Sequence, residues 1–209
     1  MNALVIAPHP DDEVIGCGGA IRLGIERGES VSAVFLTSGE LGLKHRPRAE
    51  AWEVREKEAR RAAVILGLAK LHFLRQPDWM LGDHIRAAAK ALGQVLAEER
   101  PTLVYLPHPE DGHPDHRATL PILQTALKGW RGQKPELLAY EVWTPLAAHD
   151  LVVDISGTIK RKLHALRAHR SQLGEFDYAR AVTGLNQFRG ALAGKCRFAE
   201  VFQHLSPKV

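Results

Sequence analysis

The sequence is poor in cysteine, in aromatic residues and in long apolar runs, and each shortage excludes a class of protein. Only two cysteines, Cys17 and Cys196, occur in 209 residues, and neither belongs to a C-x-x-C pair. A disulfide framework is therefore excluded, and both thiols are expected in a small, buried setting. No apolar stretch is long enough to cross a bilayer, and no basic region precedes the first apolar run. We therefore expect a soluble, cytoplasmic chain with no membrane partner.

Charge of one sign is also scarce. The 28 Lys and Arg residues face 24 Asp and Glu residues, which leaves a formal net charge of +4. Basic residues alternate with acidic ones along the expected helices, as in residues 53–58, and the densest basic run, residues 160–162, accompanies no nucleic-acid-binding motif. We therefore expect solvated helix faces and no nucleic-acid partner.

The hydrophobic pattern predicts one α/β domain over residues 1–209, because apolar runs that suit buried strands alternate with helical segments. The expected strands are residues 3–6, 30–36, 70–74, 102–106, 137–142 and 151–155. The expected helices are residues 15–27, 49–66, 83–99, 117–128, 158–171 and 178–193, and residues 41–48 are expected to form a long loop. This rhythm predicts a doubly wound, mostly parallel sheet flanked by helices.

A dinucleotide-binding fingerprint is missing from the first strand-to-helix turn. Gly16, Gly18 and Gly19 do not fit the pattern G-x-G-x-x-G, and they follow a polar turn instead of forming it. Close packing of the first helix on the sheet explains these glycines better.

A first polar cluster, residues 7–13, lies between the first expected strand and the first helix. His9 and Asp12 stand three residues apart and can face one point if the chain turns helically, whereas Asp11 projects in another direction. Imidazole with a carboxylate oxygen suits zinc, although other divalent ions accept the same ligands. The alternative is that these residues only turn the chain and cap the helix, since Asp is favoured at helix N-termini.

A second polar cluster follows the fourth expected strand, where residues 108–116 contain three histidines and three acids. In a doubly wound sheet of order 3-2-1-4-5 the first and fourth strands are neighbours, so we expect both clusters to open into one crevice. A catalytic zinc takes three protein ligands and leaves one position for water. His116 is our choice for the third ligand, and His113 with Asp115 could make an oriented, protonatable imidazole.

The other histidines are interpreted as capping or surface residues, Asp78 as a turn residue and Trp79 as a buried side chain. These other histidines are His45, His72, His84, His108, His149, His164, His169 and His204.

The two clusters together resemble the signature of the LmbE-like, or PIG-L, family of N-acetylglucosaminyl deacetylases. The signature is Pro-His-Pro-Asp-Asp-Glu at residues 8–13, followed by His-Pro-Asp-His at residues 113–116. Residues 37–40 and 162–172 are similar to further segments of the family. Residues 188–190 and 199–202 resemble the branch that deacetylates the malate glycoside of N-acetylglucosamine in bacillithiol synthesis.

The resemblance implies a Rossmann-like fold, a divalent metal that is usually Zn²⁺, and hydrolysis of the N-acetyl group of a small amino-sugar substrate. The metal ligands that it implies are His9, Asp12 and His116. It makes Asp11 the general base, and His113 the acid or the group that stabilises the oxyanion. It gives Asp115 the task of orienting His113, and Arg55 a contact with the substrate.

Two other functions stay open at this point. One is a zinc hydrolase of another amide or N-acyl substrate, and the other is a Rossmann-like nucleotide-binding or regulatory protein with a structural metal. Against the second stand the missing glycine fingerprint and the count of three ligands, since a structural zinc usually has four. The sequence leaves open the aglycone, the physiological metal and whether the chain forms a homo-oligomer.

Overall fold

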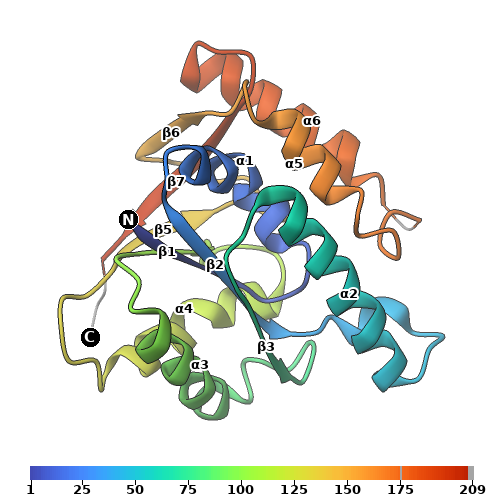
Figure 1. Cartoon of the computed structure of the whole chain (residues 1–209), viewed down its shortest axis with the longest axis vertical. Helices are drawn as coiled ribbons and strands as arrows, with labels where there is room; N and C mark the ends of the chain where they lie inside the picture. Colours follow the sequence, from blue (N-terminus) through green and yellow to red (C-terminus); the bar gives the residue numbers. More distant parts are fainter. Residues whose placement is uncertain (175, 207–209) are drawn as a thin grey trace.

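The computed structural model describes residues 1–174 and 176–206, and it confirms the predicted α/β fold (Figure 1). In this described part, seven strands form one sheet in the order β3-β2-β1-β4-β5-β7-β6. The strands are β1 (Asn2–Ala7), β2 (Ser30–Thr37), β3 (Leu71–Gln76), β4 (Leu103–Pro107), β5 (Glu136–Tyr140), β6 (Leu151–Asp154) and β7 (Ala199–Leu205). Strands β1 to β5 are parallel, as predicted, whereas β7 pairs antiparallel with both β5 and β6.

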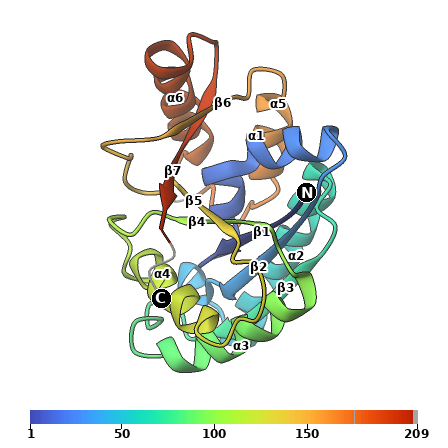
Figure 2. The ribbon, with the colours of Figure 1, turned by 90° about the vertical axis from the view of Figure 1, so that its left-hand side faces the viewer.

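Helices cover both faces of the sheet. They are α1 (Asp12–Glu26), α2 (Arg48–Leu66), α3 (Ile85–Glu99), α4 (Pro114–Leu127), α5 (Ile159–Leu166) and α6 (Tyr178–Arg189), with short turns η1 (Glu40–Leu43) and η2 (Gly190–Gly194). Figure 2 shows α3 and α4 on the side of the sheet opposite to α1 and α5. Side chains alternate accordingly along β1: Ala3, Val5 and Ala7 pack in the core under α1, while Leu4 and Ile6 pack under α3 and α4.

The glycines of α1 are explained by close packing, as expected. A Cβ on Gly16 would lie 2.1 Å from the Tyr140 ring, and one on Gly19 would lie 2.7 Å from Ile155. Tyr140 is fully buried and donates a hydrogen bond to the carbonyl oxygen of Ile6, so its ring cannot easily move away. The glycines therefore let α1 approach the sheet, and with it the residues that precede the helix.

Several expected boundaries were wrong. The strand β7 was not predicted, and the helix expected over 158–171 ends at Leu166. Asp83 does not cap α3, which begins at Ile85 after His84. The helix expected from residue 117 begins at Pro114, because Pro is favoured in the first turn of a helix. In the described residues no helix is long and apolar enough to span a membrane.

Candidate active site

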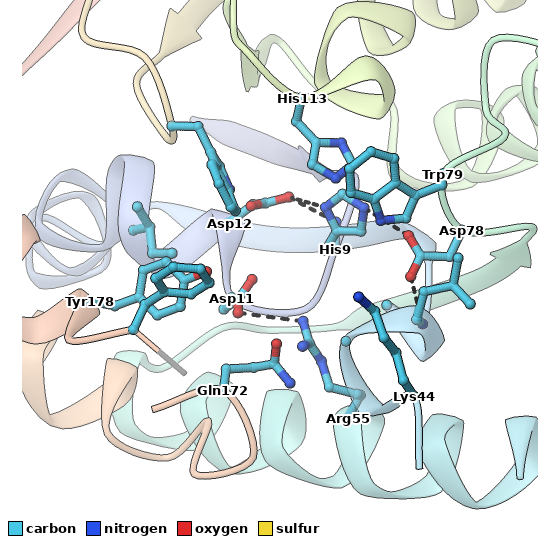
Figure 3. Close-up of a pocket in the computed structure, with 16 residues that line it drawn as sticks. His9, Asp11, Asp12, Lys44, Arg55, Asp78, Trp79, His113, Gln172 and Tyr178 are labelled. Atoms are coloured by element: carbon cyan, nitrogen blue, oxygen red, sulfur yellow. Dashed lines mark hydrogen bonds and ion pairs between the residues drawn. The ribbon is translucent and has the colours of Figure 1, made fainter. Parts of the chain in front are cut away.

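Two loops at one edge of the sheet bring the polar clusters together. Strands β1 and β4 are parallel neighbours, so the loops that follow them open at the same edge. His9 lies in the first loop and Asp12 begins α1, whereas His113 caps α4 and His116 lies in its first turn. Figure 3 shows His9, Asp12 and His113 lining one cavity. The predicted meeting of the two clusters is therefore confirmed.

Three side-chain atoms form a nearly regular triangle. His9 Nδ1 lies 3.2 Å from Asp12 Oδ2, His116 Nε2 lies 3.2 Å from the same oxygen, and the two nitrogens are 3.3 Å apart. A tetrahedral zinc ion with bonds of 2.0–2.1 Å spaces its ligand atoms about 3.3–3.4 Å apart. The triangle therefore fits a tetrahedral metal with three protein ligands and one open position.

The outer nitrogens of both histidines are held by carboxylates. His116 Nδ1 lies 2.9 Å from Asp111 Oδ1, and His9 Nε2 lies 3.1 Å from Asp78 Oδ1 and 3.3 Å from Asp115 Oδ2. A carboxylate on one ring nitrogen fixes the tautomer and leaves the other nitrogen free to bind a metal. In its neutral form each histidine thus presents a lone pair to the centre of the triangle.

The electrostatics of this triangle favour a cation. Burial lowers the pKa of His116, but the charge of Asp12 and the hydrogen bond that His116 donates to Asp111 outweigh this effect and raise that pKa to about 9. Burial also lowers the pKa of His9, but hydrogen bonds to the carboxylates of Asp115, Asp12 and Asp78 raise that pKa well above its ordinary value. A site that stabilises positive charge on two adjacent imidazoles also suits a divalent ion.

Asp11 stands beside the triangle in a strained backbone conformation. Its φ of 129° is rare for any residue with a side chain. Its backbone N–H donates to Glu13 Oε2 at 3.1 Å, and Arg55 Nη2 donates to Pro10 O at 2.6 Å and lies 3.4 Å from Asp11 Oδ2. Burial raises the pKa of Asp11 to about 7, although the charge of Arg55 opposes this rise. The carboxyl group is thus poised to exchange a proton near neutral pH.

His113 is held differently from the expectation. Its Nδ1 accepts the backbone N–H of Asp115 at 3.2 Å, which makes Nε2 the protonated nitrogen of the neutral ring. Burial, together with the charges of His9 and His116, lowers the pKa of His113 to about 4. His113, which was expected to be a protonatable imidazole, is therefore a neutral ring that can donate from Nε2.

The orienting role expected for the Asp115 carboxylate is also corrected. Its oxygens accept the backbone N–H groups of Trp79, at 2.8 Å, and Leu81, at 3.1 Å, and one of them faces His9. Asp115 orients the His113 ring through its backbone, while its carboxylate fixes the turn after β3 against His9.

Comparison with known proteins agrees with this geometry. A family model described as PIG-L: GlcNAc-PI de-N-acetylase matches residues 4–127. The chain belongs to this family. It is 33% identical over 195 residues to the diacetylchitobiose deacetylase of Thermococcus kodakarensis, a match that covers 83% of this chain and 71% of the relative. It is 30% identical over 183 residues to a probable N-acetyl-alpha-D-glucosaminyl L-malate deacetylase 2 of Bacillus cereus, covering 82% and 83%.

Among solved structures, a conserved protein from Thermus thermophilus is similar over the whole fold. It has a TM-score of 0.85 and 33% identity, covering 100% of this chain and 96% of that chain. The resemblance to the PIG-L family that the two motifs indicated is thus confirmed.

In this PIG-L family member the cavity has a volume of about 220 Å³ and an aromatic rim. Three aromatic residues line it, and they are 57%, 54% and 48% exposed: Trp79, Trp143 and Phe176. The expectation of a buried Trp79 was therefore wrong. Exposed aromatic faces beside a polar floor suit a ligand with both apolar and hydroxyl surfaces, such as a sugar. Arg55 also lines this cavity, where it was expected to meet substrate.

The sequence analysis missed two carboxylates and misplaced two histidines, one of which, His108, is only 3% exposed. Asp111 and Asp78 hold the outer nitrogens of His116 and His9. Asp111 belongs to the second polar cluster, but only the folded structure shows that it bonds to His116. His169, interpreted as a capping or surface residue, is fully buried, and its Nε2 lies 4.0 Å from Glu13 Oε1. Burial, followed by the charge of Arg55, lowers the pKa of His169 to about 3.

Proposed function

We propose that the chain is a zinc-dependent hydrolase that removes the N-acetyl group from N-acetylglucosaminyl glycosides. The observation that carries this proposal is the triangle of His9 Nδ1, Asp12 Oδ2 and His116 Nε2. Beside it lies the carboxylate of Asp11, a residue with a strained backbone. The family of the chain and the substrates named for its two relatives support the choice of an acetamide as the bond that is cleaved.

The three atoms of the triangle would hold the metal. Zinc bound there would supply a water of lowered pKa and would polarise the acetamide carbonyl. The Asp11 carboxylate accepts the proton that the attacking water loses, and Arg55 holds this carboxylate and its backbone in place. The neutral His113 ring donates from Nε2 to the carbonyl oxygen as negative charge develops on it. Asp11 then returns its proton to the leaving amine, which releases acetate and a free amino sugar.

The substrate is proposed to be a small glycoside of N-acetylglucosamine. The substrates named for the diacetylchitobiose deacetylase and for the malate-glycoside deacetylase share the N-acetylglucosaminyl unit and differ in the group attached to it. The aromatic rim of the cavity can pack against the sugar ring, while the acetamide lies over the triangle. The malate glycoside of bacillithiol synthesis is our first candidate, and the unpaired thiols Cys17 and Cys196 are compatible with the proposed cytoplasmic location.

Acetate release tests the proposal. The zinc-loaded chain is expected to release acetate from diacetylchitobiose or from the malate glycoside, and to lose this activity on chelation while its circular dichroism remains that of a folded protein. Release of an acyl group only from N-acyl amino acids or simple acylamines would replace the sugar with another substrate class. Unfolding on chelation, with no hydrolysis of any amide, would instead indicate a structural metal.

A further inference from the structure

Lys44 stands out among the charged groups that line the cavity. The lining acids are all engaged: Asp12 lies in the triangle, Asp11 faces Arg55, and Asp78 bonds to His9 and to the backbone N–H of Leu41. Arg55 is engaged as well. Within the part of the chain that the structure describes, Lys44 makes no hydrogen bond or ion pair, and its side chain extends toward the cavity in Figure 3.

The segment that carries Lys44 is fixed to the site. The turn η1 ends one residue before Lys44, and its Leu41 N–H donates to Asp78 Oδ2 at 2.9 Å. At the start of the same turn Glu40 Oε1 pairs with Arg48 Nη2 at 2.8 Å. Because Asp78 also holds His9, the position of Lys44 is tied to the triangle through two consecutive contacts.

The Arg55 guanidinium lines the same cavity as Lys44 (Figure 3). Arg55 is 2% exposed, and its Nε is buried without a partner among the described residues. A Cβ on Gly39 would lie 2.9 Å from Arg55 Nη2, and one on Gly42 would lie 3.1 Å from Nη1, so the two glycines leave space for this group. This side of the cavity therefore combines two cationic groups, one of which is unpaired.

We propose that Lys44 forms a subsite for an anionic group on the aglycone, so that the preferred substrate is an N-acetylglucosaminide with a carboxylate-bearing aglycone. This inference rests on the proposed function. The glycosidic bond of such a sugar lies on the carbon next to the one that bears the acetamide, so an aglycone stays close to the reacting amide. An unpaired ammonium group that lines the same cavity as the triangle would form a charge-assisted hydrogen bond with a carboxylate and would gain nothing from a neutral aglycone.

A matched pair of substrates tests the subsite. The malate glycoside of N-acetylglucosamine and its dimethyl ester share one skeleton and differ by two negative charges and two methyl groups, and kcat/KM is measured for both with the zinc-loaded chain. The native chain is expected to prefer the diacid about tenfold or more. Lys44→Gln is expected to remove most of this preference, Lys44→Glu to reverse it, and Lys44→Arg to keep it. The control Lys90→Gln removes the same charge from an exposed position of α3 and is expected to leave the preference unchanged.

The outcomes separate this inference from the function on which it rests. Equal kcat/KM for the diacid and the ester, or an unchanged ratio in Lys44→Gln, would refute the subsite. Acetate release from either glycoside would still support the proposed deacetylase activity. Failure of the native chain to deacetylate any glycoside, the neutral ones included, would refute the proposed function and the subsite together.

Discussion

Asp111 gives the sharpest test of the proposed metal site, because it lies outside the triangle and yet bonds to the outer nitrogen of His116. Four donors converge on its carboxylate. Oδ1 accepts from His116 Nδ1 and from the backbone N–H of His113, each at 2.9 Å, and Oδ2 accepts from Trp143 N at 2.9 Å and Thr144 N at 3.1 Å. In Asp111→Asn one oxygen becomes an NH₂ group, so one pair of donors must face another donor.

Loss of such a carboxylate partner typically lowers metal affinity 10- to 100-fold. This range corresponds to about 1.4–2.7 kcal/mol of binding free energy. We therefore expect Asp111→Asn to weaken zinc binding by this factor, measured at constant pH by competition with a chromophoric chelator. Urea unfolding of the metal-free variant shows whether the protein remains folded.

The neighbouring acid provides a matched control. Glu110 is exposed, so Glu110→Gln changes the net charge equally without removing an acceptor from His116, and it is expected to bind zinc with the native affinity. If a folded Asp111→Asn variant bound zinc as tightly as the native chain, the assignment of His116 Nε2 as a ligand oriented by Asp111 would be wrong.

Three further predictions concern the base, the buried histidine and the packing of α1. Asp11→Asn should lower kcat/KM about a hundredfold or more with zinc still bound. It should also abolish the rise in kcat/KM that the native chain shows as the pH increases and Asp11 loses its proton. Near-native turnover of this variant would contradict the assignment of Asp11 as the base. Because the pKa of His169 falls to about 3 on folding, from an ordinary 6.5, its contribution to stability is complete above pH 6.5 and declines at lower pH. Urea unfolding of the metal-free chain should show that His169 accounts for about 2 kcal/mol of the free energy of unfolding that is lost between pH 7 and pH 5. His169→Phe should remove this share of the loss. If the variant lost as much stability as the native chain over this pH range, the assignment to His169 would be wrong. Gly16→Ala should destabilise the fold by about 1–3 kcal/mol through its clash with Tyr140, whereas Gly93→Ala, in an open part of α3, should stabilise it by about 0.5–1 kcal/mol, both measured by thermal unfolding.

The parallel part of the sheet could be predicted because its strands are buried on both faces and therefore appear as apolar runs. The strand β7 could not, since its residues 199–205 include Glu200 and His204 and it pairs with β5 without a preceding βα unit. Glu200 is buried because its carboxylate accepts the backbone N–H groups of Gly19 and Ala20 and pairs with Lys162. Such a distant partner leaves no local periodicity to detect.

The site was predictable where its chemistry is concentrated in sequence, as in the two motifs. The directions of its hydrogen bonds were not. Asp115 stands two residues after His113, yet its carboxylate points to the turn after β3, because successive residues at a helix N-terminus project in different directions. Lys44 was equally hidden, since a lysine in a polar loop has no pattern that separates a cavity-lining side chain from a solvated one.

The strain at Asp11 explains how two adjacent carboxylates can be used for different tasks. Asp12 begins α1, and its carboxylate is part of the triangle. If Asp11 also had helical backbone angles, the helix would fix the direction of its side chain relative to Asp12. The φ of 129° breaks that constraint at a cost of about 1–3 kcal/mol. The hydrogen bonds from Asp11 N to Glu13 and from Arg55 to Pro10 O hold the strained turn from both sides. The same arginine that faces the carboxylate of the proposed base therefore also maintains the backbone that keeps this base apart from the proposed metal ligands.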